Sequence, residues 1–199
     1  YLHQDVLIVY KRFLFEIINI FQKQPQTGML GMVGNTKITK EIAPWADGAV
    51  RIGGVSADII EKTVNTNFGK AKQPAQNVIF IDGLLMATQY DIEWREDLFQ
   101  GWDMYDLSQS LEFWRAGYEV AVPSMEIPWV FHDNDISNLE NYEKWKTVFE
   151  KEYRRDCRQW NGKMLEKKAA DRVIYQLYRK EEIQISFPYP PVYEEDADY

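Results

Sequence analysis

Two residues near the start of the chain and a third far along it could together hold a metal ion. His3 and Asp5 are separated by one residue, so extended or turning backbone can direct both side chains to one site. His132, the second of two histidines, follows the apolar run 128–131. Imidazole and carboxylate groups are ligands of divalent cations such as Mn²⁺ and Mg²⁺. Taken singly, Asp5 favours a solvated strand end and His132 a structural histidine, so a metal site requires the fold to bring them together.

An acidic group could supply a general base. Glu96, Asp97, Asp103 and Asp106 surround the pair Gly101-Trp102. A carboxylate at a helix start beneath a cleft is well placed to accept a proton. The same place favours a capping role, because carboxylates bind free N–H groups and interact with the helix dipole. We assign Asp103 to the N-cap and Asp106 to catalysis, with Asp97 as the competing base.

The elements that must position these residues predict an α/β layer architecture. Apolar residues at helical spacing predict helices over residues 11–24 and 103–116, the second ending at Gly117. Short apolar runs predict extended segments over residues 29–33, 78–81, 84–88 and 118–122. Residues 35–77 are interpreted as an insertion with little regular structure, with a hairpin turn at Asp47-Gly48 and a break at Gly53-Gly54. Strand, helix and strand in turn indicate an α/β fold.

The C-terminal part differs in character and predicts a second region. We expect an α/β region over residues 1–137 and a helical extension with an extended acidic tail over residues 138–199. Amphipathic helices are predicted over 138–160 and 164–181. The first of these should pack through Leu139, Tyr142, Trp145 and Phe149. Their role is predicted to be structural, including contact with a second copy of the chain in a homo-oligomer.

Composition excludes several classes of protein. The net charge is −8, from 31 acidic and 23 basic residues, whereas nucleic-acid binding requires clustered Lys and Arg. One cysteine, Cys157, excludes an internal disulfide and a thiolate zinc cluster and suits a reducing compartment. No apolar run approaches the roughly 20 residues of a membrane span. We therefore expect a cytoplasmic protein without a transmembrane segment, at most peripheral to a membrane, and with no nucleic-acid partner.

Five motifs follow one another along the chain: HQDV (3–6), GMLGMVG (28–34), IDGLLMATQ (81–89), WREDLFQGWDMYDLSQSLEFWRAGYEVAVP (94–123) and PWVFH (128–132). Their order resembles nucleotide-sugar glycosyltransferases of the GT-A fold, in the family-two-like group named after a streptomycin-biosynthesis protein (StrF-like). The resemblance implies the later part of a Rossmann-like nucleotide-diphospho-sugar transferase fold. Because the DxD-like motif falls almost at Tyr1, the first nucleotide-binding strands are expected upstream of it.

The resemblance implies a role for each matching residue. Asp5 takes the final acidic place of the DxD motif, which binds the metal, and His3 stands where the first aspartate is usual. Asp106 matches the catalytic base of an "ED" pair, with Tyr105 in place of the glutamate. Metal binding is also implied for His132, and donor or acceptor contacts for His3, Asp82, Gly83 and Glu96, beside the competing base Asp97. Trp94, Trp102 and Trp129 are candidate apolar platforms for sugar rings.

These implied roles predict a metal-dependent, inverting glycosyltransferase. The donor is expected to be a nucleotide-diphosphate sugar and the acceptor a glycan or small molecule with a free hydroxyl. Mn²⁺ or Mg²⁺ would offset the charge of the diphosphate, and Asp106 would take the proton of the acceptor hydroxyl. The alternative is a glycosyltransferase-like carbohydrate-binding or interaction module without turnover. A metal-dependent phosphate-ester hydrolase is a third interpretation, for which further histidine ligands are missing.

Overall fold

The computed structural model describes residues 1–39, 42, 44, 45, 47–59, 62–133, 140–160, 175 and 176. Within them the helices are α1 (Phe13–Lys23), α2 (Tyr105–Arg115) and α3 (Tyr142–Gln159). The larger sheet has the order β1 (Val6–Ile8), β11 (Val130–His132), β4 (Val50–Ile59), β3 (Val33–Lys37) and β7 (Phe80–Ile81), with β5 (Lys62–Gly69) paired to β4. A second sheet has the order β6 (Ala75–Asn77), β10 (Glu119–Pro123), β2 (Thr27–Gly31) and β8 (Met86–Thr88). A third pairs β9 (Tyr90–Asp91) with β12 (Tyr175–Gln176).

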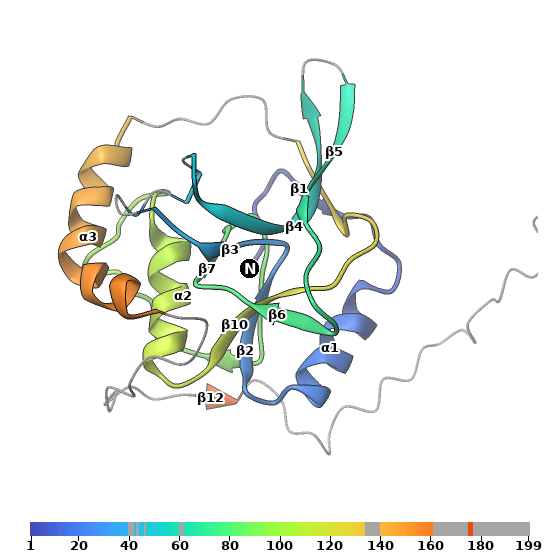
Figure 1. The fold of residues 1–199 in the computed structure, drawn as a ribbon, viewed down its shortest axis with the longest axis horizontal. Helices are drawn as coiled ribbons and strands as arrows, with labels where there is room; N and C mark the ends of the chain where they lie inside the picture. Colours follow the sequence, from blue (N-terminus) through green and yellow to red (C-terminus); the bar gives the residue numbers. More distant parts are fainter. Residues whose placement is uncertain are drawn as a thin grey trace, which may run out of the picture.

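The sheets are mixed and lie between helices. Among the described strand pairs, β10 with β2 and β11 with β4 are parallel, and the others are antiparallel. Helices α2 and α3 lie on one side of the strands and α1 on the other, while the β4–β5 hairpin protrudes from the body (Figure 1). The prediction of an α/β protein is confirmed at this level. No described helix has the length and apolar character needed to cross a membrane.

Helix α1 forms where the apolar stripe was predicted. Its buried residues are Phe13, Ile17, Ile20 and Phe21, a spacing that places them on one face. This face packs into a hydrophobic cluster that also contains Trp129. The stacked contact of Tyr10 with Trp129, whose ring centroids are 5.1 Å apart, covers the same cluster. Trp129 is thus a core residue, and it is the one of the three candidate sugar platforms that packs inside.

Helix α2 ends where predicted but begins differently. Gly117 adopts φ 89°, a left-handed conformation that a glycine reaches at little cost, and its N–H donates to the carbonyl of Trp114. At the other end, the predicted N-cap Asp103 is wrong. The N-cap is Met104, with φ 66° and no side-chain capping bond. The first-turn amide of Leu107 instead donates to Oδ1 of Asp106, one residue before it.

The prediction of little regular structure between residues 35 and 77 is wrong. This stretch contains most of β3 and all of β4, β5 and β6. Residues 51–57 of β4 alternate between half-buried and buried positions, but two of the buried positions are Gly54 and Ser56. Ser56 Oγ donates to Asn65 Oδ1 of β5 over 2.6 Å. Small and polar residues carry the alternation here, so a pattern based on apolar residues could not show it.

The predicted break at Gly53-Gly54 is a bulge within β4. The pairing with β5 shifts register between these two glycines, and Gly53 adopts φ 97°. A Cβ at Gly53 would lie 2.0 Å from the carbonyl oxygen of Met32, so only glycine permits this approach. Strand β4 therefore continues beyond the bulge to the residues that pair with β11.

The predictions for the C-terminal part have mixed outcomes. Helix α3 confirms the first predicted helix for its described part, while residues 138 and 139 lie outside the described residues. In the second predicted helix only Tyr175 and Gln176 are described, and they form strand β12, so the helix is wrong there. The predicted acidic tail and the boundary between residues 137 and 138 fall outside the described residues. The contact with a second copy of the chain stays a prediction.

Helix α3 shares one core with α2 and the larger sheet. Phe149 and Tyr153 are fully buried, and Phe149 contacts Phe80 of β7 with ring centroids 5.9 Å apart. Tyr142 and Trp145 are partly buried against the same cluster, as predicted. Trp145 lies directly on Gly101, where an added Cβ would be 2.9 Å from the indole nitrogen. The extension therefore supports the loop that leads into α2.

We predict that Phe149→Ala lowers the free energy of unfolding by about 3–5 kcal/mol, because it removes a fully buried ring from the contact between α3 and the core. Urea denaturation followed by circular dichroism measures this change. The matched control is Lys151→Ala on the exposed face of the same helix, which should change the value by less than about 0.5 kcal/mol. A silent Phe149→Ala, or α3 amides that exchange as fast as in a free peptide, would contradict this packing.

Candidate functional site

The register between β1 and β11 determines where Asp5 lies. Val6 is paired with His132 in this antiparallel pair. Next to it, the backbone N–H of Asp133 donates to the carbonyl oxygen of Asp5 over 2.8 Å. Side chains at neighbouring positions of paired strands are within reach of one another. The predicted convergence of Asp5 and His132, which lie far apart in the sequence, is therefore observed.

His3 reaches the same place through a different contact. Leu2 forms an isolated antiparallel bridge with Leu85, and the N–H of His3 donates to the carbonyl of Leu84 over 3.1 Å. A turn then leads through Asp5 into β1. The segment after β7 thus positions His3, whereas β11 positions Asp5.

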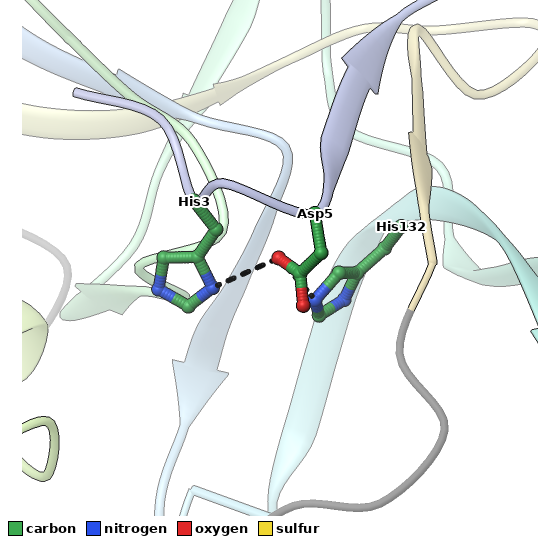
Figure 2. A group of neighbouring side chains, drawn as sticks. All are labelled: His3, Asp5 and His132. Atoms are coloured by element: carbon green, nitrogen blue, oxygen red, sulfur yellow. Dashed lines mark ion pairs between the residues drawn. The ribbon is translucent and has the colours of Figure 1, made fainter.

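The Asp5 carboxylate lies between the two imidazole rings, as Figure 2 shows. Its Oδ1 is 3.4 Å from Nε2 of His132 and 3.9 Å from Nδ1 of His3. One ligand atom from each of the three residues lies within 4.8 Å of the others. Ligands about 2.0–2.2 Å from one metal have donor atoms on the order of 3–4 Å apart. The spacing therefore suits one shared cation.

A polar atom at the centre of this cluster lies near two ring nitrogens but accepts no hydrogen bond in the described structure. Asp5 Oδ1 is buried, and no described group donates a hydrogen bond to it. A buried carboxylate oxygen that accepts no hydrogen bond is costly, so the two ring nitrogens, or a cation bound between them and the carboxylate, must stabilise it. One carboxylate oxygen and two imidazole nitrogens form a donor set suited to a divalent metal of borderline character. The residues present fit the predicted cation, although its binding stays a prediction.

The second nitrogen of His3 is held by Tyr105. His3 Nε2 and the Tyr105 hydroxyl are 2.6 Å apart, a short hydrogen bond between the opening segment and the start of α2. The ring of Tyr105 lies beside Trp94, with centroids 6.1 Å apart. Burial and the neighbouring charges of Asp106 and Asp82 raise the pKa of the Tyr105 hydroxyl, which stays protonated at neutral pH. Sequence reasoning noted Tyr105 only as a replacement and did not find this contact.

A cleft of about 470 Å³ opens beside the cluster. It is lined by Tyr1, Leu2, His3, Gly83, Trp94, Gln100, Gly101, Trp102 and Tyr105. Trp102 is 78% exposed, and its ring meets that of His3 edge to face at 6.4 Å between centroids. Small-molecule sites commonly have about 300–1,000 Å³ and aromatic linings. Of the three candidate sugar platforms, Trp94 and Trp102 therefore lie on the cleft.

Asp106 lies beneath the cleft floor at Gly83. Its Oδ2 accepts a hydrogen bond from the Gly83 N–H over 2.9 Å, and its Oδ1 accepts one from the Leu107 N–H over 2.9 Å. Burial, followed by the nearby charge of Asp82, raises the pKa of Asp106 to about 7. A general base is most effective when its pKa lies near the working pH. This pKa is compatible with the predicted base, and the catalytic role of Asp106 stays a prediction.

Asp82 interacts electrostatically with both Asp106 and the two histidines. Its Oδ1 accepts a hydrogen bond from the Leu84 N–H over 3.1 Å, which fixes the turn that follows β7. Burial raises its pKa, and the nearby rings of His3 and His132 act in the opposite direction. The acidic side chain thus faces the same site from a third element.

Asp97 and Glu96 lie outside the cleft. The Arg95 guanidinium binds Asp97 through two hydrogen bonds of 2.8 Å, and the Asp97 side chain is 62% exposed. Glu96 is exposed and borders a smaller cavity of about 130 Å³ next to Trp94. The structure therefore places Asp106 beneath the cleft floor at Gly83, while it places Asp97 in a surface ion pair. The acceptor role of Glu96 stays a prediction.

A charged network behind the cleft wall was missed by sequence reasoning. Arg115 of α2 binds Glu112 at 2.9 Å, Glu152 at 2.8 Å and Asp156 at 2.5 Å, and Arg95 binds the same Glu152 at 3.2 Å. Glu112 with Arg115 and Glu152 with Asp156 have helical spacing. That spacing is the only signal in the sequence, and it is indistinguishable from that of solvated helix faces.

Comparison with known proteins adds one positive finding. No curated protein sequence matches the chain. The model of a family described as glycosyltransferase-like matches residues 1–153, which include the metal-type cluster, the cleft, α2 and most of α3. This match supports a glycosyltransferase at a general level and does not extend to the StrF-like group. The chain belongs to this glycosyltransferase-like family.

Proposed function

We propose that this family member transfers a sugar from a nucleotide-diphosphate donor to an acceptor hydroxyl, with a bound divalent cation and inversion at the anomeric carbon. The observation that carries the proposal is the buried Oδ1 of Asp5, which accepts no hydrogen bond from a described group and lies between ring nitrogens of His3 and His132, next to an aromatic cleft. A cation site beside a cleft of sugar size is what transfer from a diphosphate donor requires.

Mn²⁺ is the cation that we propose for the cluster, in preference to Mg²⁺. Mg²⁺ favours oxygen ligands and retains several waters, whereas two of the three side chains here offer imidazole nitrogen. When bound, the cation supplies positive charge to the departing diphosphate. Asp5 would provide the one anionic ligand of the cation, and His3 and His132, which lie on either side of this carboxylate, would provide the nitrogen ligands.

The cleft provides a surface for a sugar ring. Trp94, Trp102 and Tyr105 present apolar faces and edges, while Gly83 leaves the cleft floor open. Apolar C–H faces of sugars can pack on such rings, whose tips still offer polar groups. The exposed Trp102 beside His3 is the residue best placed to contact a sugar whose diphosphate lies at the cluster.

Asp106 is proposed as the general base. It would accept the proton of the acceptor hydroxyl as that oxygen attacks the anomeric carbon from the face opposite the diphosphate. The two N–H donors from Gly83 and Leu107 fix the orientation of its carboxyl group. A single displacement of this kind inverts the anomeric configuration.

The first prediction for this function concerns metal binding. Titration of the chain with Mn²⁺, followed by electron paramagnetic resonance of the free ion, should show one binding site. Asp5→Asn and His132→Ala should each weaken binding by at least about 10-fold, because each removes a ligand. Asp133→Asn is the matched control, since it removes the same charge from an exposed residue beside His132. Equal affinities in all four proteins would refute the site.

The second prediction concerns the base. Asp106→Asn should lower the release of nucleoside diphosphate from a panel of UDP-, GDP- and dTDP-sugars by about 10²- to 10⁴-fold, with Mn²⁺ affinity retained. Asparagine can accept only one of the two N–H bonds, which costs about 1 kcal/mol and offsets part of the stability gained by removing a buried charge. Asp103→Asn and Asp97→Asn are the controls and should retain turnover. A silent Asp106→Asn beside an inactive Asp97→Asn would move the base to Asp97.

A third prediction follows from the raised pKa of Asp106. The base works only when it is deprotonated, so turnover should rise with pH through about 7 and then level off. Asp82, Tyr105 and Tyr142 of α3 are titratable groups that interact with Asp106, and burial raises the pKa of both tyrosines so that they stay neutral over this range. A pH profile of turnover at saturating donor and acceptor tests this. A flat profile between pH 5 and 9 would be incompatible with Asp106 as base. Mn²⁺ binding without turnover at any pH would instead indicate a binding module.

A further inference from the structure

Tyr105 contacts His3 of the metal-type cluster and also lines the cleft. Its hydroxyl forms the 2.6 Å hydrogen bond to Nε2 of His3. The opposite ring nitrogen of His3, Nδ1, faces Oδ1 of Asp5 at 3.9 Å. His3 is therefore held at one nitrogen by α2 and offers the other nitrogen to the cluster.

We propose that Tyr105 is a positioning residue that fixes the ring orientation and the proton of His3, so that Nδ1 presents its lone pair to the cation. This inference rests on the proposed metal site. A neutral imidazole carries one proton, and a nitrogen that binds a metal must be free of it. With the proton on Nε2, His3 donates to the Tyr105 oxygen, and Nδ1 is left as the ligand.

The same arrangement assigns the proton of Tyr105 itself. A phenolic oxygen can accept one hydrogen bond and donate another. If its oxygen accepts from His3, its O–H is available to a hydroxyl or phosphate oxygen of a ligand in the cleft. Tyr105 would thus connect the ligand in the cleft with the orientation of a metal ligand.

The surroundings of Tyr105 show that this placement is tightly determined. A Cβ at Gly83 would lie only 2.2 Å from the Tyr105 hydroxyl, so this position has no room for any larger residue unless the hydroxyl moves. Trp94 lies beside the ring, and Tyr105 is the first residue of α2. The hydroxyl is therefore held in place by three separate segments of the chain.

The test is a double-mutant cycle measured by Mn²⁺ affinity. Tyr105→Phe removes the hydroxyl and keeps the ring. It should weaken Mn²⁺ binding by about 10- to 100-fold, the usual effect of losing the partner of a metal-binding histidine. In a His3→Ala background the same substitution should change the affinity by less than about 2-fold, because Tyr105 acts through His3.

Two controls separate positioning from loss of structure. Tyr90→Phe removes a hydroxyl that donates to the carbonyl of Pro25, on a different part of the surface, and should leave Mn²⁺ affinity unchanged. The thermal midpoint of Tyr105→Phe should stay close to that of the unmodified chain. If the midpoint falls, Mn²⁺ affinity is measured at a temperature well below it. The comparison of Tyr105→Phe in the unmodified and His3→Ala backgrounds then still tests the inference.

The possible outcomes distinguish this inference from the function on which it rests. Full Mn²⁺ affinity in Tyr105→Phe, together with loss in Asp5→Asn, would overturn the role of Tyr105 and leave the metal site standing. Equal weakening with and without His3 would also overturn it, since the effect would not pass through the histidine. Failure of the unmodified chain to bind Mn²⁺ would overturn the metal site and this inference together.

Discussion

The antiparallel register of β1 and β11 is the constraint on which the site depends. Pairing Val6 with His132 places Asp5 beside that histidine, and a slip of one residue would turn each side chain to the opposite face of the sheet. Val6 is buried while the rest of β1 is exposed, so one apolar side chain distinguishes the two faces. The hydrogen bond from Asp133 to Asp5 extends the pairing beyond the strand. The pairing of β1 with β11 therefore brings Asp5 and His132 together, and the chemistry of the cluster depends on that pairing.

The buried carboxyl group of Asp106 reduces the stability of the fold when it is ionised. Its pKa in the fold is about 7, whereas an unfolded aspartate has a pKa of about 3.9. Folding thus favours the neutral acid. The stability that this group contributes is fully present below about pH 4 and is lost as the pH rises through about 7. The charged form that would act as a base is the form that the fold disfavours, a conflict typical of working sites.

Local patterns in the sequence predicted the elements with strong periodicity. Local spacing of apolar residues, glycine and proline was enough to predict three features. These are the apolar face of α1, the end of α2 at Gly117 and the strand that ends at Pro123. Asp103 failed as a cap because Met104 enters a left-handed conformation that no sequence rule signals for methionine. The contact between His3 and Tyr105 depends on two segments that meet only in the folded chain. Family resemblance marked the places of Asp5 and His132, but only strand pairing explains why they meet.

The wall of the cleft is attached to helix α3. Gly101 lies against Trp145, and Arg95 binds Glu152, so the loop that carries Trp94 and Trp102 is held at two points by one helix. A wall that is already ordered loses little conformational entropy when a ligand arrives. Under the proposed function, selectivity would come from how well a sugar matches the fixed outline of the cleft, and substitutions of Trp145 or Glu152 in α3 would change which sugar fits without contacting it.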